Sequence, residues 1–436
     1  MLILSYQVDA SGFHARIPEN LKVLSWRTDF YPSVIPGRNF SRLDNHNDAV
    51  MTQIALDNPS VSRVEAALNP MIVRGFVDEI RNIPNQVKSL EARYYDDVEP
   101  AHGFGRYWNG YAPFIRVFGS IFSYQQLRVF NYLCMGILMG LACYFINRTL
   151  DRNFMYAFIL CLVATSIYLV PLSLQYISCF YIMFSSIIAL CWLVQRYGKD
   201  APVLELLALS AIATAYFDLL TAPLVVVGTL TILYAGWLYR DRSLDGSKIM
   251  GQLMVLGFSW WGIYAAFWAT KPIVARLFSV GGVGADASAT FMKYFTHASP
   301  SDWIHATFYN IATLMGATSM DVNVKDYLYW LYVVAFFIAL AFSVVLWVWV
   351  IKRQGQVVDS LVIKRYLPLL AVAITPFLWW EITPWRAANH IFTYREIAVF
   401  LFGLAAFYIL TYYEVRAATV QGQSRLTAPQ PQDEDL

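Results

Sequence analysis

Residues 329–351 read YWLYVVAFFIALAFSVVLWVWVI and contain no charged side chain. An α-helix rises about 1.5 Å per residue, so about 20 apolar residues cross the hydrocarbon core of a bilayer, which is about 30 Å thick. This stretch is therefore long enough to span a membrane as one helix. Comparable windows recur along the chain and predict an all-α, polytopic transmembrane helical bundle. The nine predicted spans are residues 129–147, 154–172, 177–195, 203–219, 221–239, 250–269, 329–351, 367–383 and 391–413.

The composition agrees with this class of protein. Of the 436 residues, 58% are hydrophobic and 14% are charged, whereas soluble domains carry about 25% charged residues. The net charge of +2 gives no basic face for nucleic acid. The five cysteines form no CxxC pair, so neither a disulfide framework nor a zinc site is indicated. Because there is no P-loop, GxSxG, HExxH or GxGxxG motif in a suitable context, we expect no nucleotide cofactor and no ATP-driven pump.

Basic residues give the bundle an orientation. They gather in every second connection, which the positive-inside rule assigns to the cytoplasm. We therefore expect a multi-pass protein of the cytoplasmic (inner) membrane, with residues 1–128, a loop at 270–328 and a turn at 384–390 on the extracytoplasmic side. Arg386 is the exception, a basic residue in an outside turn. The basic residues of the cytoplasmic connections are Arg148, Arg152, Arg196, Lys199, Arg240, Arg242, Lys248, Lys352, Arg353, Lys364, Arg365, Arg416 and Arg425.

The two ends of the chain differ from the bundle. Residues 1–128 form an extracytoplasmic region whose apolar spacing predicts amphipathic helices at 47–57, 60–68 and 71–92. An outside region of this length needs a preceding span or an export signal, so we expect a tenth spanning helix ahead of this sequence. The bundle extends over 129–413, and the polar residues 414–436 predict a disordered cytoplasmic tail.

Asp44 and Asp48 are the first candidate site, four residues apart in the stretch RLDNHND at 42–48. One interpretation is catalytic: a general base takes a proton from an acceptor hydroxyl, and the second carboxylate orients substrate or a cation. The other is structural, with a helix N-cap and a surface acid. The charge pattern places both carboxylates on the same side of the membrane as the candidate residues described below. This common location favours the catalytic interpretation, with Asp44 as the base. Two carboxylates beside His46 neither require nor exclude a divalent cation, so the cofactor stays unknown.

Asp218 and the start of the last span are further candidates. Asp218 follows a long apolar run, and an ionisable group at membrane depth costs roughly 2.5–3.5 kcal/mol, so it faces a cavity or partner, or caps the next helix. The last span opens with NHIFTYRE at 389–396. Free N–H groups at a helix N-terminus bind anions, so His390 and Arg395 are candidates for holding a phosphate or pyrophosphate. Alternatively, Arg395 pairs with Glu396 or another acid.

Two more groups lie at the outer ends of predicted spans. Arg106, Tyr107 and Trp108 combine a cation, hydrogen-bond donors and flat aromatic faces, which suit a sugar, although an interfacial aromatic belt has the same composition. Lys271 either meets a lipid phosphate or extends along the apolar surface to the interface.

Four motifs, in this order, resemble GT-C-type polytopic membrane glycosyltransferases, a group that includes poorly characterised bacterial integral membrane proteins. They are LDNxxDAxM at 43–51, RYWxGY at 106–111, YFDLLTAP at 216–223 and NHxFTYR at 389–395, and the resemblance runs from about residue 30 to about residue 410. It implies that Asp44 or Asp48 acts in catalysis and that the sugar donor is carried on a polyprenyl phosphate or diphosphate. It also implies a spanning helix ahead of the acidic loop.

The predicted function is therefore transfer of a sugar from a polyprenyl-phosphate donor to an acceptor hydroxyl at the outer face of the cytoplasmic membrane. The predicted partners are that donor, a glycan or lipid-linked acceptor, and membrane lipids. One alternative is a lipid-linked glycan polymerase or ligase, although the 270–328 loop has only Arg276 as an arginine. Another is a lipid or sugar transporter (flippase), although the ionisable groups lie mostly at helix ends. The predicted substrate-binding residues are Arg106, Tyr107, Trp108, Asp218, Lys271, His390, Tyr394 and Arg395.

Overall fold

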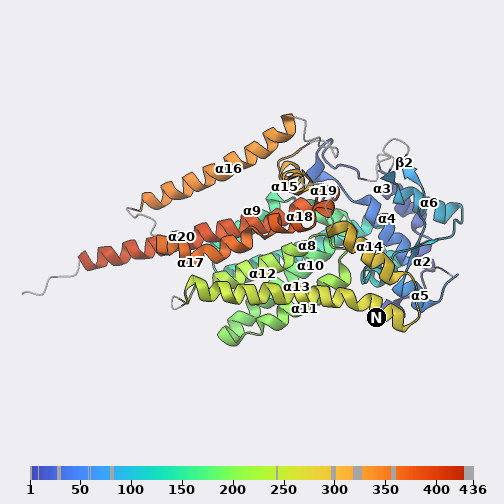
Figure 1. Ribbon diagram of the computed structural model, residues 1–436, viewed down its shortest axis with the longest axis horizontal. Helices are drawn as coiled ribbons and strands as arrows, with labels where there is room; N and C mark the ends of the chain where they lie inside the picture. The colour runs from blue at the N-terminus through green and yellow to red at the C-terminus, as the bar shows by residue number, and fades with distance from the viewer. Residues whose placement is uncertain are drawn as a thin grey trace, which may run out of the picture.

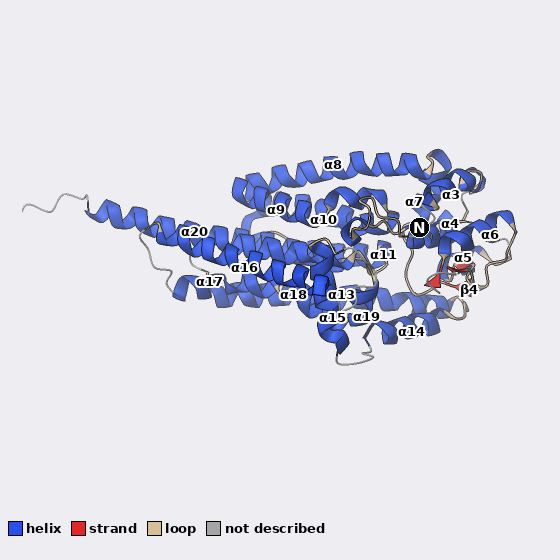
Figure 2. Ribbon diagram, turned by 90° about the horizontal axis from the view of Figure 1, so that it is seen from above, coloured by secondary structure: helices blue, strands red, loops and turns tan. Residues whose placement is uncertain are grey.

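The computed structural model describes residues 2–7, 9–26, 31–56, 58, 60–78, 83–241, 244–295, 301–317, 327–354 and 360–426. Long helices run side by side along the longest axis, and the N-terminal helices cover one end of them (Figures 1 and 2). The predicted all-α helical bundle is confirmed. The bundle helices are α8 (Tyr124–Thr149), α9 (Arg152–Ala164), α10 (Leu174–Tyr197), α11 (Val203–Phe217), α12 (Pro223–Leu238), α13 (Gly246–Leu277), α16 (Tyr327–Lys352), α17 (Ser360–Ala373), α18 (Thr375–Ile382) and α20 (Ile397–Leu426).

Among the described residues, six helical stretches are long and apolar enough to cross a membrane, as expected for a multi-pass membrane protein. They match six of the nine predicted spans: Tyr124–Thr149, Leu174–Asp200, Gly246–Leu277, Tyr329–Lys352, Ser360–Ile382 and Thr393–Thr419.

The other three predicted spans are the shorter helices α9, α11 and α12, of 13, 15 and 16 residues. The window 154–172 is broken because Ser166 adopts a left-handed conformation at φ +60°, and a 3₁₀ helix, η3 (Ile167–Leu172), follows. Whether these three helices cross the membrane stays a prediction.

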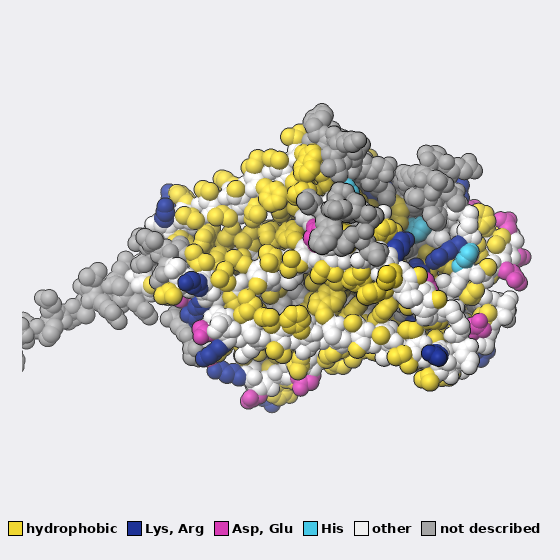
Figure 3. Space-filling model, viewed as in Figure 1, with side chains coloured by type: hydrophobic (Ala, Val, Ile, Leu, Met, Phe, Trp, Pro, Cys, Tyr) yellow, Lys and Arg dark blue, Asp and Glu magenta, His cyan; other side chains and the backbone are white. Residues whose placement is uncertain are grey.

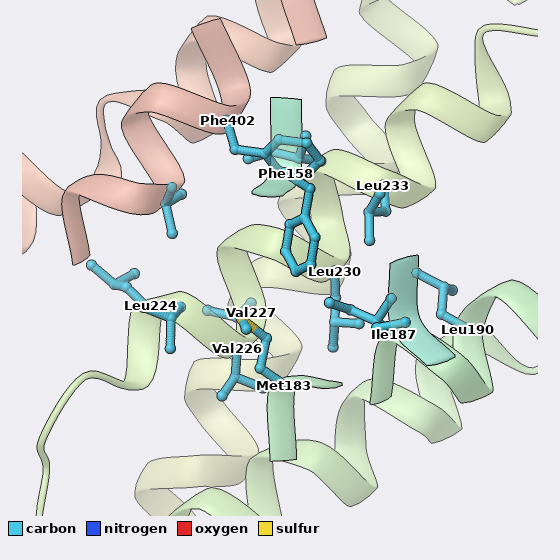
Figure 4. Close-up of a cluster of buried hydrophobic side chains, with 14 of the residues drawn as sticks. Phe158, Met183, Ile187, Leu190, Leu224, Val226, Val227, Leu230, Leu233 and Phe402 are labelled. Atoms are coloured by element: carbon cyan, nitrogen blue, oxygen red, sulfur yellow. The ribbon is translucent and has the colours of Figure 1, made fainter. Parts of the chain in front are cut away.

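Helix α12 lies at the centre of the bundle. Every residue of it except Tyr234 and Trp237 is buried, and a helix that is apolar all round belongs to a core. Side chains of α12, such as Leu224, Val227 and Leu230, point towards neighbouring helices in the cluster of Figure 4. The outer flank of the bundle is apolar instead of polar (Figure 3), which is the arrangement a lipid environment favours.

The basic connections between helices lie at one end of the bundle, as their alternation along the sequence predicts. Arg240 donates to the Thr149 carbonyl at 2.6 Å, and Lys199 pairs with Asp241 at 2.5 Å. These contacts join the ends of α8, α10 and α12, so the basic connections lie together at one end of the bundle. The N-terminal region lies at the other end (Figure 1). The compartment on each side stays a prediction.

The N-terminal region is a compact helical cap with two very small sheets. Strand β1 (Met71–Ile72) pairs antiparallel with β4 (His102–Gly103), and β2 (Val77–Asp78) pairs with β3 (Ile83–Pro84). The prediction of one helix over 71–92 is therefore wrong before residue 86, because Gly75 at φ +115° and Pro84 interrupt it. The helices are α1 (Leu2–Ser5), α2 (Ser11–His14), α3 (Ile17–Leu24), η2 (Asn39–Ser41), α4 (Asn45–Ala55), α5 (Arg63–Leu68), α6 (Gln86–Tyr95) and α7 (Ala112–Ile121).

Three further segments differ from expectation. The predicted loop at 270–328 contains helices α14 (Val283–Phe295) and α15 (Ser301–Leu314), and α13 continues to Leu277. The turn before the last span folds into α19 (Pro384–Asn389) and η5 (Thr393–Glu396). The predicted disordered tail is helical from 414 to 426, and residues 427–436 lie outside the described structure. Glu414 contributes to that order by pairing with Arg365 at 3.3 Å.

Candidate functional site

Asp44 and Asp48 lie together at the start of α4, and both are fully buried. Asp44 is the N-cap of α4, whereas the structural interpretation expected Asp48 to cap a helix that begins later; that expectation is wrong because α4 already begins at Asn45. Its carboxylate accepts from the Asn47 backbone N–H at 2.9 Å and from the Asn47 side-chain amide at 2.7 Å. Its own N–H donates to Ser173 Oγ at 3.0 Å. The pair is thus anchored both within α4 and against the start of α10.

Asp48 lies in the first turn of α4, and because neither carboxylate is exposed, the alternative that includes a surface acid is wrong. Its carboxylate accepts from the hydroxyl of Tyr124 and, at 2.9 Å, from the Gln175 backbone N–H. Burial, followed by the charge of Asp48, raises the pKa of Asp44 to about 7. Burial also raises the pKa of Asp48 to about 6. Both carboxyl groups can therefore exchange a proton near neutral pH.

Arg395 is buried beside this pair. Its guanidinium lies 4.3 Å from the centroid of the Tyr176 ring and 4.9 Å from that of Tyr394. All three of its side-chain nitrogens lack a hydrogen-bond partner among the described residues. Its charge opposes the rise in the pKa of Asp44. A buried guanidinium without acceptors is costly, which makes Arg395 a candidate for meeting an anionic group.

A cavity of about 380 Å³ lies on the neighbouring face of α4, and we name it the basic pocket. His46 and Asn47 line it from α4. Its charged lining residues are Arg74, Arg106, Lys293 and Asp286. Three cations against one carboxylate leave an excess of positive charge, which suits an anion such as a phosphate. Figure 3 shows basic and histidine side chains gathered beside α14.

Two more predicted residues, Tyr107 and His390, do not line this pocket but lie next to its lining residue Tyr294. The hydroxyls of Tyr107 and Tyr294 lie 3.1 Å apart, and Tyr294 stacks on Trp385 with centroids 5.6 Å apart. His390 lies with its ring centroid 5.9 Å from that of Trp385. Burial, followed by the charge of Arg386, lowers the pKa of His390 to about 3. A neutral imidazole offers a single N–H donor and no positive charge, so the expected role of His390 in holding a phosphate is reduced to one hydrogen bond.

Three other predicted residues have structural contacts instead. Trp108 donates from Nε1 to the Phe267 carbonyl at 3.1 Å, and Tyr394 donates to the Phe40 carbonyl at 2.8 Å. Lys271 is fully buried and donates to the Tyr107 carbonyl. It therefore does not extend to the interface, and that expectation is wrong; its contact with a lipid phosphate stays a prediction.

Asp218 belongs to a separate buried cluster. It ends α11 and accepts from the Thr221 N–H at 2.5 Å. Arg386 binds the carbonyls of Leu220, at 2.7 Å, and of Thr221, and pairs with Glu396 at 3.4 Å. The alternative for Arg395 was a pair with Glu396 or another acid; Glu396 pairs with Arg386 instead, and no described acid bonds to Arg395. The cluster fixes the α11–α12 turn against the start of α20.

A second cavity, of about 610 Å³, lies between α8, α10 and α11, and we name it the apolar groove. Phe118, Phe130, Ile177 and Leu209 are among its lining residues. Met51 of α4 also lines it, one turn beyond Asn47. The buried carboxylates therefore lie at a helix end whose two flanks face a basic pocket and an apolar groove.

No metal centre is evident in the described part of the chain, where no group of three or more His, Cys, Asp or Glu side chains converges. Asp44 and Asp48 are instead engaged by hydrogen bonds. Comparisons with protein-family models, curated proteins and solved structures gave no match to this chain. The likeness to GT-C glycosyltransferases therefore rests on its four sequence motifs.

Sequence reasoning missed several residues of this region. Arg74, Asp286 and Lys293 lie in segments predicted to be an amphipathic helix and a loop, and no sequence spacing connects them to Arg106. Arg386 did carry a signal, since it is a basic residue in an otherwise uncharged turn that the charge pattern predicts to lie outside. A basic residue that departs from the charge pattern in this way is a candidate for a buried or functional cation, and Arg386 is buried.

Proposed function

We propose that the protein is a membrane glycosyltransferase, which moves a sugar from a polyprenyl-phosphate donor to an acceptor hydroxyl at the outer face of the cytoplasmic membrane. The observation that carries the proposal is the position of the buried carboxylate pair. Asp44 and Asp48 begin a helix that presents Asn47 to the basic pocket and Met51 to the apolar groove. A substrate with a phosphate head and a hydrocarbon chain matches both surroundings.

The basic pocket takes the phosphate in this proposal. Arg74, Arg106 and Lys293 stabilise the negative charge that grows on the phosphate as the sugar leaves. Arg395 and His390 assist from nearby, the first with its unpartnered guanidinium and the second as a neutral donor. The apolar groove takes the hydrocarbon chain.

Asp44 is the proposed base. A carboxylate with a pKa of about 7 accepts a proton efficiently at neutral pH. The acceptor oxygen attacks the anomeric carbon, the carbon–oxygen bond to the phosphate breaks, and the acceptor proton passes to Asp44. Asn47 covers both oxygens of Asp44 and lines the pocket, so a substrate that engages Asn47 frees the base. Asp48 raises the pKa of Asp44 and is its helper, and Asp218 positions Arg386 nearby.

The test uses purified protein in lipid vesicles with undecaprenyl-phosphate-linked sugars as donors. Asp44→Asn should lower the transfer rate by about 10²-fold or more, because general-base catalysis contributes about 10²–10⁴-fold. Asp200→Asn, at the other end of the bundle, is the control. A folded Asp44→Asn protein that retains transfer would contradict the assignment.

The same assay separates the alternatives. A flippase leaves the donor intact, an enzyme consumes it, and a polymerase yields products of many sugar units.

A further inference from the structure

Helix α14 forms one wall of the basic pocket. Its residues Asp286, Thr290, Lys293 and Tyr294 line the cavity, and their spacing places them on one helical face. The opposite face is apolar and exposed, with Phe291 at 49% and Met292 at 58%. A helix with its polar face inward and its apolar face outward is typical of a membrane surface.

The carboxylate of Asp286 occupies the donors that an anion in this pocket would use. Its Oδ1 accepts from Arg106 Nη1 at 3.0 Å, and its Oδ2 accepts from the Arg106 backbone N–H at 3.1 Å. Among the described residues lining the pocket, Asp286 is the one acid. Arg106 Nε is buried without a partner, so the guanidinium is only partly satisfied by this contact. A phosphate has more acceptor oxygens than a carboxylate and can engage more of these donors.

Helix α14 is lightly attached to the rest of the protein. Only Val283 and Ala287 of its residues are buried. The chain enters it through two positive-φ residues, Ser279 at +57° and Gly282 at +81°. A segment with so little buried apolar surface opens at small energetic cost.

We propose that Asp286 is an internal occupant of the basic pocket, which an incoming phosphate group displaces, and that the first turn of α14 is released in the exchange. The kind of ligand rests on the proposed function, but the exchange itself does not. Because the outer face of α14 is apolar, we assign the phosphate to a membrane lipid. Inorganic pyrophosphate supplies the same chemistry from solution.

The first test measures binding of inorganic pyrophosphate and of undecaprenyl phosphate in detergent. Asp286→Asn should bind both about tenfold more tightly than the native protein, because the competing charge is gone. Arg106→Gln should bind both more weakly, and Asp200→Asn should match the native protein. In the double variant, Asp286→Asn should give no gain on the Arg106→Gln background. A folded Asp286→Asn protein with unchanged or weaker binding would overturn the proposal.

A second test needs no variant. Hydrogen–deuterium exchange of the native protein should become faster in peptides covering 281–288 when either ligand binds. Unchanged or slower exchange there would refute the release of α14. Tighter binding of pyrophosphate but not of undecaprenyl phosphate to Asp286→Asn would refute the lipid source. Binding is read without sugar transfer, so failure of the glycosyltransferase proposal would appear separately, as ligand exchange without activity.

Discussion

The buried pair Asp44 and Asp48 makes the stability of the protein depend on pH. Burial raises the pKa of Asp44 from 3.8 to about 7 and that of Asp48 from 3.8 to about 6. In the unfolded chain both groups return to ordinary values, so the folded protein binds more protons between about pH 4 and pH 7. The stabilisation is complete below about pH 4 and is lost as the pH rises through 6 and 7.

The magnitude follows from the two shifts. One pKa unit corresponds to about 1.4 kcal/mol, so the shift of Asp44 is worth about 4 kcal/mol and that of Asp48 about 3 kcal/mol. Asp48→Asn removes the second contribution. It also removes the neighbouring charge, which is the second cause of the rise at Asp44. The variant should therefore lose about half of the pH dependence that this pair contributes.

The assay is thermal unfolding in detergent between about pH 5 and pH 8. Other groups titrate as well, so the informative quantity is the difference in Tm between the native protein and Asp48→Asn at each pH. As the pH rises, the Tm of Asp48→Asn should increase relative to that of the native protein. The Tm of the control Asp200→Asn should follow that of the native protein at every pH. A difference that is constant with pH would refute the reasoning.

Two further predictions concern a buried ion pair and the close packing of a glycine. Glu396→Gln should lower the free energy of unfolding by about 3 kcal/mol or more, because it leaves the buried charge of Arg386 uncompensated. If the effects of Glu396→Gln and Arg386→Met on this free energy were strictly additive, the two residues would not form a pair. Gly228→Ala should destabilise the folded protein by about 1–3 kcal/mol, because its new Cβ would lie 2.5 Å from Val399 Cγ1. Thermal unfolding measures this loss of stability. Gly140→Ala, with nothing within 4 Å, should be neutral or stabilising by up to about 1 kcal/mol, and equal effects at the two sites would exclude this packing.

The long helices were predictable because each carries its own signal. The run at 329–351 and its counterparts satisfy the length and hydropathy of a span without reference to neighbours. The window 71–92 was not predictable in this way. Its apolar spacing fits a helix, but Gly75, Pro84 and pairing with His102–Gly103 produce short strands instead.

The sequence by itself determined a helical membrane protein, the sorting of its basic connections to one end, and the two carboxylates ahead of the bundle. These properties depend on local composition and on the alternation of basic and other connections along the chain. Only the tertiary structure decided which charges meet. Arg106 and Lys293 lie far apart in sequence yet line one cavity, and Glu396 pairs with Arg386 and not with Arg395. Burial and Coulomb interactions act between neighbours in space, so the pKa values of Asp44 and Asp48 follow from packing that no local pattern records.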